Sequence, residues 1–185
     1  MPSFENATSL VTQPLLLVVM GVSGVGKSTI ATEVAKRSGF VFLDADDLHS
    51  DEAIAQMSQG IPLTDKQRGP WIQRIYRQLC DYRSDNANCI LAYSGLKQQH
   101  REIIFSSYQH RAGVLLTAGE QVIIERLANR RDHFMSPQLL SSQIADMEPF
   151  DEDVPLLVCD VTATVEQLVA EVEGFVRLVQ GESAI

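Results

Sequence analysis

Hydrophobic residues fall into short continuous runs that alternate with longer segments of helical periodicity. Apolar runs of strand length lie at 15–20, 40–43, 89–93, 113–117 and 156–159. Segments with helical patterning lie at about 28–38, 51–59, 70–84, 98–108, 119–130, 137–147 and 165–179. Continuous apolar runs are typical of strands buried on both faces, and their alternation with helices indicates βαβ units. The pattern predicts an α/β fold with three layers, in which helices cover both faces of a parallel sheet of five strands.

The first apolar run leads directly into a glycine-rich segment. The sequence G-x-x-x-x-G-K-[ST] is met by Gly21, Val22, Ser23, Gly24, Val25, Gly26, Lys27 and Ser28. The glycines allow backbone N–H groups to close around phosphate oxygens, and the following helix, with Thr29 in its first turn, points its positive end at the same anion. Lys27 can reach the β- and γ-phosphates, and the Ser28 hydroxyl can ligate Mg²⁺. The segment 21–29 is therefore predicted to bind a nucleoside triphosphate.

Carboxylates follow the second predicted strand, where ligands bind in parallel sheets. Side chains two apart in a strand share a face, so Asp44 and Asp46 are expected to point into one cleft. We assign Asp44 to the metal or its waters, and Asp46 to orienting an acceptor hydroxyl and taking its proton. The alternative is that Asp46 or Asp47 caps the next helix.

Further polar residues are candidates for contact with an acceptor. His49 could hydrogen-bond it or lie at the surface, and Arg68 could reach an anionic acceptor or be a solvated loop charge. The segment 60–69 is predicted to be a loop, with Pro70 in the first turn of the next helix and Trp71 as a packing anchor.

Two cationic groups complete the candidate site. Lys97 and Arg101 are spaced i, i+4 on a predicted helix, so both could face one carboxylate or a transferred phosphate, unless they are ordinary surface cations. Arg126 and Arg130 share the same spacing. They either offset the dipole at the helix C-terminus or belong to a mobile lid at about 130–137 that closes over the triphosphate.

Length and charge narrow the class of protein. The 185 residues predict one domain, and the net charge of −9 without a Lys/Arg run argues against a nucleic-acid-binding face. The three cysteines form no C-x-x-C pair, the N-terminus lacks a basic signal-peptide region, and no apolar run approaches the roughly 18 residues of a membrane span. These features favour a cytoplasmic protein that does not associate with membranes.

Taken together, the clusters resemble the small P-loop gluconokinases, which are related to shikimate and nucleoside-monophosphate kinases. Beyond the glycine motif, the matching residues include Asp44, Asp46, Asp47, Leu48, His49, Gly60, Pro62, Leu63, Thr64, Asp65, Arg68, Pro70, Trp71, Ser94, Leu96, Lys97, Arg101, Arg126, Leu127, Arg130, His133, Phe134, Leu139, Leu140, Ser142, Gln143, Glu148 and Pro149. The resemblance implies a cytosolic carbohydrate kinase, usually a homodimer, that uses ATP and Mg²⁺ to convert D-gluconate to 6-phosphogluconate.

The resemblance also implies roles for individual residues within a single kinase domain spanning 1–185, with an acceptor-binding helical segment at about 45–85. Asp46, Lys27 and Arg130 would act in catalysis, and Arg126 would join the glycine motif in binding the nucleotide. Ser28 and Asp44 would hold the metal. The residues implied to contact the acceptor are Asp46, His49, Arg68, Lys97, Arg101 and His133.

Several residues depart from the family pattern, mostly on the acceptor side. They are Ala45, Ser50, Ala53, Gln67, Tyr93 and Gly95. The departures leave open a kinase for another aldonate or a shikimate-like polyol acid, because a lost polar partner can loosen hydroxyl selection. A nucleotide-binding regulator without catalysis is a further alternative.

Overall fold

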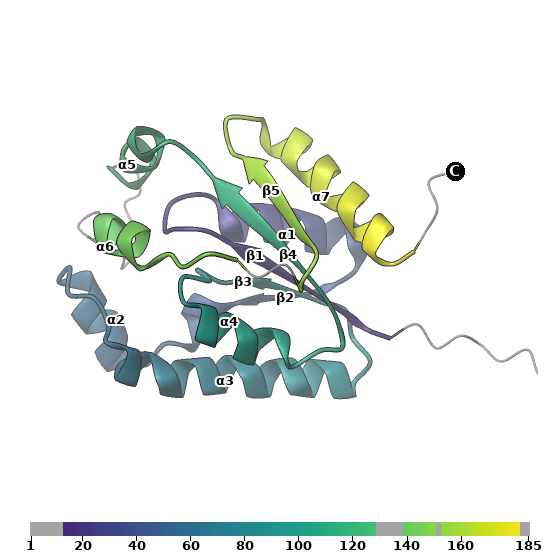
Figure 1. Ribbon diagram of the computed structural model, residues 1–185, viewed down its shortest axis with the longest axis horizontal. Coiled ribbons are helices and arrows are strands. Elements are labelled where there is room, and N and C mark those ends of the chain that lie inside the picture. Colours follow the sequence, from purple (N-terminus) through teal and green to yellow (C-terminus); the bar gives the residue numbers. More distant parts are fainter. Residues whose placement is uncertain (1–12, 129–138, 151–152, 182–185) are drawn as a thin grey trace, which may run out of the picture.

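The computed structural model describes residues 13–128, 139–150 and 153–181. Within these ranges the chain forms one parallel sheet with strand order β2-β3-β1-β4-β5 (Figure 1). The strands are β1 (Leu15–Met20), β2 (Val41–Asp44), β3 (Cys89–Ala92), β4 (His110–Thr117) and β5 (Leu156–Asp160). The predicted α/β class and the five parallel strands are confirmed.

Helices cover both faces of the sheet, as the alternating pattern predicts (Figure 1). The helices are α1 (Lys27–Ser38), α2 (Asp51–Ser58), α3 (Asp65–Ser84), α4 (Gln98–Phe105), α5 (Glu120–Ala128), α6 (Leu139–Asp146) and α7 (Val165–Val179), together with a short 3₁₀ helix η1 (Ala45–Leu48). Residues of α1 and α7 belong to the core on one face, and residues of α3 and α4 to the core on the other.

The central strand β1 shows why the fold is a three-layer sandwich. All six of its residues are buried, and successive side chains point to opposite faces of the sheet. Leu15, Leu17 and Val19 pack in the core beneath α1 and α7. Leu16, Val18 and Met20 pack in the core beneath α3 and α4. A strand buried on both faces therefore carries a continuous apolar run, and it holds the glycine motif that follows it at the centre of one sheet edge.

The start of α3 differs from the prediction. The helix begins at Asp65, because Thr64 and Gln67 form a reciprocal capping box, and Pro70 lies inside the helix. Pro70 has no N–H to donate to the carbonyl of Lys66, but the helix continues through it to Ser84. The loop predicted at 60–69 is therefore wrong beyond Thr64. The T-x-x-Q spacing was the missed signal.

No helix within 13–128, 139–150 or 153–181 is both long enough and apolar enough to span a membrane. The lid predicted at 130–137 lies outside the described residues, as do Arg130 and His133.

Candidate active site

The glycine motif forms a tight loop between β1 and α1. Gly21 adopts φ 137°, and a Cβ there would lie 2.6 Å from the carbonyl oxygen of Leu116, so only glycine fits this position. Gly24 and Gly26 also have positive φ, at 83° and 110°. The loop thereby turns sharply from the buried strand into the helix.

The N-terminus of α1 is built to receive an anion. Gly26 is its N-cap and supplies no side-chain acceptor, and the first turn contains no acidic residue. The backbone N–H groups of that turn are therefore left to a ligand or solvent, and the helix dipole favours negative charge there. Lys27 folds back over the loop, where its Nζ donates to the carbonyl of Val22 at 3.2 Å. The loop thus combines backbone donors with an ammonium group, as a phosphate site requires.

Two oxygen-bearing side chains meet beside this loop. The Ser28 hydroxyl donates to Asp44 Oδ2 at 2.5 Å, which joins the start of α1 to the end of β2. Both are hard oxygen donors of the kind that Mg²⁺ prefers. Among the described residues, no group of three or more His, Cys, Asp or Glu side chains could hold a metal by itself. The pair therefore suits Mg²⁺, which takes one or two protein ligands and completes its shell with phosphate oxygens and water.

Asp46 lies near this pair, but the backbone around it differs from the extended strand that was predicted. It lies in η1 rather than in a strand, so the predicted two-residue alternation is wrong. Asp44 instead caps η1, and its Oδ1 accepts the Asp46 backbone N–H at 3.0 Å. Ser50 caps α2, so neither Asp46 nor Asp47 is the cap of that helix.

A small cavity of about 40 Å³ adjoins Asp46. Its lining residues are Asp46, His49, Met57, Pro62, Leu63, Arg68, Trp71, Ser94, Leu96, Ser142 and Gln143. Three predicted acceptor-binding residues, Asp46, His49 and Arg68, therefore line one cavity. Trp71 anchors its wall, because its Nε1 donates to the Ala45 carbonyl at 2.7 Å and its ring stacks on His49 at 4.1 Å between centroids.

Burial, together with the smaller effect of the positive charges of Arg74 and Arg68, lowers the pKa of His49 to about 4. The side chain is only 3% exposed, and its Nε2 lies 3.9 Å from Asp46 Oδ1. Near neutral pH the imidazole is therefore uncharged. A neutral His49 can exchange hydrogen bonds with an acceptor but adds no positive charge beside Asp46.

The low pKa of His49 predicts an acid-sensitive fold. In the unfolded chain His49 binds a proton near pH 6.5, whereas in the folded chain it does so only near pH 4. Between these values the unfolded state holds more protons, so acidification should lower the free energy of unfolding by up to about 1.4 kcal/mol per pH unit. We expect this fall to be shallower in His49→Gln, measured by urea denaturation from pH 7 to pH 4. A difference between the two proteins that stays constant across this range would contradict the prediction.

Acidic residues near the C-terminal end of α6 pair with the predicted acceptor-binding cations. Asp146 lies 3.1 Å from Arg68 and 3.5 Å from Lys97, and Glu148 lies 3.4 Å from Lys97. Glu148 also accepts the Gln98 backbone N–H at 2.6 Å. Asp146 had no recognisable signal in the sequence, because it meets Arg68 only through the tertiary fold. A carboxylate therefore already occupies the position where the acceptor's carboxylate was expected.

Neither Lys97 nor Arg101 lines the cavity beside Asp46. Lys97 is the N-cap of α4 rather than a helical residue, and Arg101 is 2% exposed. The Arg101 guanidinium donates to the carbonyls of Gly95 at 2.8 Å and Leu96 at 3.2 Å, and to those of Glu148 and Pro149. It also lies over the Phe150 ring, 4.3 Å from the centroid.

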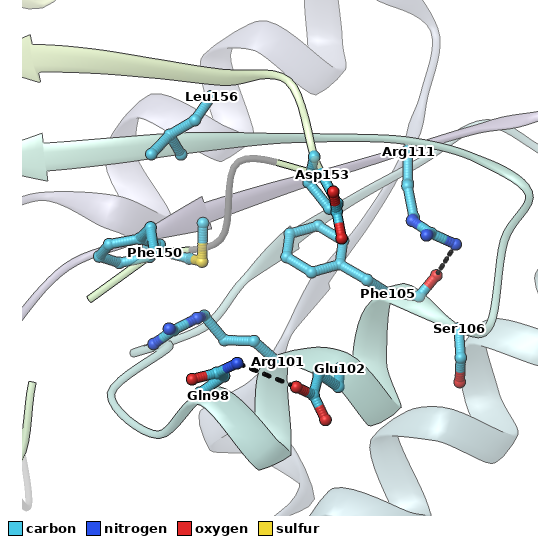
Figure 2. Close-up of a pocket in the computed structure, with 11 residues that line it drawn as sticks. Gln98, Arg101, Glu102, Phe105, Ser106, Arg111, Phe150, Asp153 and Leu156 are labelled. Carbon is cyan, nitrogen blue, oxygen red and sulfur yellow. Dashed lines mark hydrogen bonds between the residues drawn. The ribbon is translucent and has the colours of Figure 1, made fainter. Parts of the chain in front are cut away.

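Figure 2 shows Arg101 in a second cavity, of about 350 Å³, which also contains Phe105, Arg111 and Phe150. The residues that line this cavity include none of those around Asp46. The predicted acceptor contact of Arg101 is therefore wrong in this arrangement. Arg101 instead joins the loop after β3 to the segment after α6.

This arrangement makes Arg101 a stability residue. Arg101→Met would leave several buried carbonyls without donors, and we expect a loss of about 3 kcal/mol or more in the free energy of unfolding. The exposed Arg77→Met, on α3, is the matched control and should change it by less than about 0.5 kcal/mol. Urea denaturation of both variants measures the effect, and similar small losses would show that Arg101 is not needed to hold the two segments.

Arg126 lies on the nucleotide side of the site. Its guanidinium donates to the Val25 carbonyl at 3.1 Å and to the Val161 carbonyl at 3.0 Å, joining the glycine loop to the segment after β5. These residues border a hollow of about 280 Å³ that also includes Gly26, Thr29 and Ala163. A hollow of this size beside a phosphate-binding loop can take the base and ribose of a nucleotide.

Four of the six departures from the family pattern have local explanations. Gln67 completes the capping box of α3, and Ser50 caps α2. Tyr93 is 2% exposed and packs against Trp71. Gly95 has φ +66°, and a Cβ there would lie 2.8 Å from Met20, so glycine suits this turn. None of the departing residues is among those that line the cavity beside Asp46.

The fold and this arrangement define a P-loop phosphotransferase. A protein-family profile described as an AAA domain matches residues 16–149. A probable gluconokinase of Dictyostelium discoideum is 34% identical over 175 residues, which cover 89% of this chain and 88% of the relative.

Two solved structures agree with this match. The structure of a sugar kinase from Janibacter sp. HTCC2649 is 34% identical, with a TM-score of 0.84 over 93% of this chain and 99% of that one. The structure of a gluconokinase from Sinorhizobium meliloti 1021 is 35% identical, with a TM-score of 0.79 over 91% of this chain and 95% of that one. The chain belongs to the gluconokinase family and is a carbohydrate kinase.

Proposed function

We propose that the protein transfers the γ-phosphoryl group of ATP to the primary hydroxyl of D-gluconate, forming 6-phosphogluconate and ADP. One observation carries the proposal. Asp46 lines the acceptor cavity, and its backbone N–H is bound by Asp44, which in turn accepts the hydrogen bond of Ser28 beside the glycine loop. A hydroxyl in reach of Asp46 is therefore close to the place where a triphosphate would end.

The nucleotide side of the proposal uses the glycine loop and its neighbours. Backbone N–H groups of the loop and of the first turn of α1 would hold the phosphates, and the Lys27 ammonium would bind the terminal phosphate oxygens. Ser28 and Asp44 would hold Mg²⁺, which neutralises phosphate charge when bound. Arg126 would hold the glycine loop in place beside the hollow of about 280 Å³, where the nucleotide base would bind.

The acceptor side of the proposal depends on Asp46. Its carboxylate would orient the primary hydroxyl and accept its proton as the hydroxyl oxygen bonds to the γ-phosphorus. The bond from that phosphorus to the β,γ-bridging oxygen breaks at the same time, and ADP leaves. The neutral His49 would hydrogen-bond a hydroxyl of the sugar acid, and Arg68 would bind its carboxylate.

Binding of a six-carbon acid requires this cavity to open. Its volume of about 40 Å³ leaves room for only a few water molecules, since one water needs about 10–15 Å³ of such space. We propose that the acceptor's carboxylate takes the place of Asp146 at Arg68, because both are carboxylates and the existing pair is 3.1 Å long. The exchange would release α6 from α3 at this point and preserve the charge balance around Arg68.

The identity of the acceptor is supported by the family and by the cavity. The Sinorhizobium meliloti structure is of a gluconokinase, and the departures that could have changed the acceptor lie outside the cavity lining. The homodimer and the cytoplasmic location implied by the resemblance stay predictions.

The test is a coupled assay of ADP release with ATP and Mg²⁺ over a panel of gluconate, other aldonates and shikimate. We expect kcat/KM to be highest for gluconate. A clearly higher value for another acid would change the proposed acceptor, whereas tight ATP binding with no turnover of any acid would favour a regulatory nucleotide-binding role.

A further inference from the structure

Gln143 connects the acceptor cavity to the glycine loop. It lies on α6 and is only 7% exposed, which makes it one of few buried polar side chains among the described residues. Its Oε1 accepts the backbone N–H of Ser23 at 2.6 Å, across 120 residues of sequence. The same side chain lines the cavity that contains Asp46 and Arg68.

The Ser23 bond fixes which way the Gln143 amide faces. A backbone N–H can only donate, so the carboxamide must present its oxygen to Ser23 and its nitrogen elsewhere. Nε2 carries two N–H donors and has no protein acceptor within the described part of the chain. Within the described residues, Nε2 is also not among the side-chain nitrogen and oxygen atoms that are shut off from solvent without a partner. It is therefore accessible to solvent. A donor pair is therefore held in place by the glycine loop at the edge of the acceptor cavity.

We propose that Gln143 determines acceptor specificity by donating from Nε2 to a secondary hydroxyl of the sugar acid. The inference rests on the proposed function and assigns one more contact to the same site. Because the other end of the amide is bonded to Ser23, this contact would set the position of the sugar chain relative to the glycine loop. An acid that lacks the hydroxyl would leave buried donors unpaired, and sites of this kind reject such analogues strongly.

The experiment compares gluconate with its 2-, 3-, 4- and 5-deoxy analogues in the wild-type protein and in Gln143→Met. In the wild type we expect one deoxy acid to lose about 10-fold or more in kcat/KM. Gln143→Met should lose a similar factor on gluconate but little more on that same deoxy acid, because the contact is already absent. For each of the other deoxy acids, the loss in kcat/KM caused by the missing hydroxyl and the loss caused by Gln143→Met should be independent, so the two factors should multiply.

Controls separate this contact from a structural role of the Ser23 bond. Ser141 lies on the exposed side of α6. The control Ser141→Ala should have the same kcat/KM as the wild type for every acid. If Gln143 only anchored α6, Gln143→Met would lower kcat/KM by one common factor for all five acids, and this result would overturn the inference. Should Gln143→Met fail to fold, Gln143→Glu keeps an acceptor for Ser23. It should then change the ratio of gluconate to that one deoxy acid only, and unchanged ratios would overturn the inference.

The two proposals fail differently in this experiment. Wild-type protein that forms no ADP with gluconate contradicts the proposed function. Wild-type protein that turns over gluconate, but shows the common factor in Gln143→Met, contradicts only the role of Gln143.

Discussion

Lys27→Met is expected to remove turnover of gluconate by a factor of about 10³ or more while leaving the fold intact. The ammonium lies over the glycine loop, 3.2 Å from the Val22 carbonyl, where it can meet the terminal phosphate oxygens. Charge develops on those oxygens during transfer, so a fixed cation there stabilises the transition state more than the bound nucleotide. Methionine keeps most of the aliphatic side chain and removes only the charge.

The matched control is Lys36→Met on the same helix. Lys36 is exposed and pairs with Glu33 at 2.7 Å, a surface contact of little energetic weight. Steady-state kinetics and thermal unfolding of both variants measure the effect. We expect equal melting temperatures and near-normal turnover for Lys36→Met. Turnover by folded Lys27→Met within 10-fold of the wild type would show that the ammonium is not part of the catalytic machinery.

Asp46→Asn is expected to lower kcat by about 10² to 10⁴ with little change in nucleotide affinity. Asparagine preserves the size of the side chain and keeps the backbone N–H that binds Asp44. The amide oxygen is a far weaker base than the carboxylate, so the acceptor hydroxyl would keep its proton. The loss should therefore appear in the chemical step and not in the binding of ATP.

Asp47→Asn provides the comparison for this substitution. Asp47 is the next residue of η1 and is exposed, outside the cavity that Asp46 lines. Equal loss of kcat in the two variants would point to disturbance of η1 rather than to removal of a base. Weaker ATP binding in Asp46→Asn, with kcat unchanged, would instead assign Asp46 to the nucleotide side.

The glycine loop was predictable because all its determinants are local in sequence. A buried strand, a glycine motif and an amphipathic helix follow one another, and the structure places them as expected from Leu15 to Ser38. The pairing of Ser28 with Asp44 also followed, since β2 and the start of α1 lie at the same edge of the sheet. Asp46 was correctly predicted to lie near Asp44, but the predicted strand alternation was wrong. The strand ends at Asp44, and a 3₁₀ helix begins at Ala45.

The contacts of α6 could not be predicted from local pattern. Asp146 and Gln143 come close to Arg68 and Ser23 only when α6 packs near the glycine loop, and no spacing in the sequence encodes that approach. Arg101 was misassigned for a related reason. Helical spacing to Lys97 suggested a shared target, but Lys97 precedes the helix and the Arg101 guanidinium is held by carbonyls of two loops.

The proposed reaction is tested most directly by ³¹P NMR of the wild-type protein incubated with ATP, Mg²⁺ and gluconate. We expect equal loss of ATP and gain of ADP, together with one new phosphomonoester signal that coincides with added 6-phosphogluconate. Formation of inorganic phosphate in place of the ester, or an ester at another position of the acid, would contradict the assignment of Asp46 and its cavity to the primary hydroxyl.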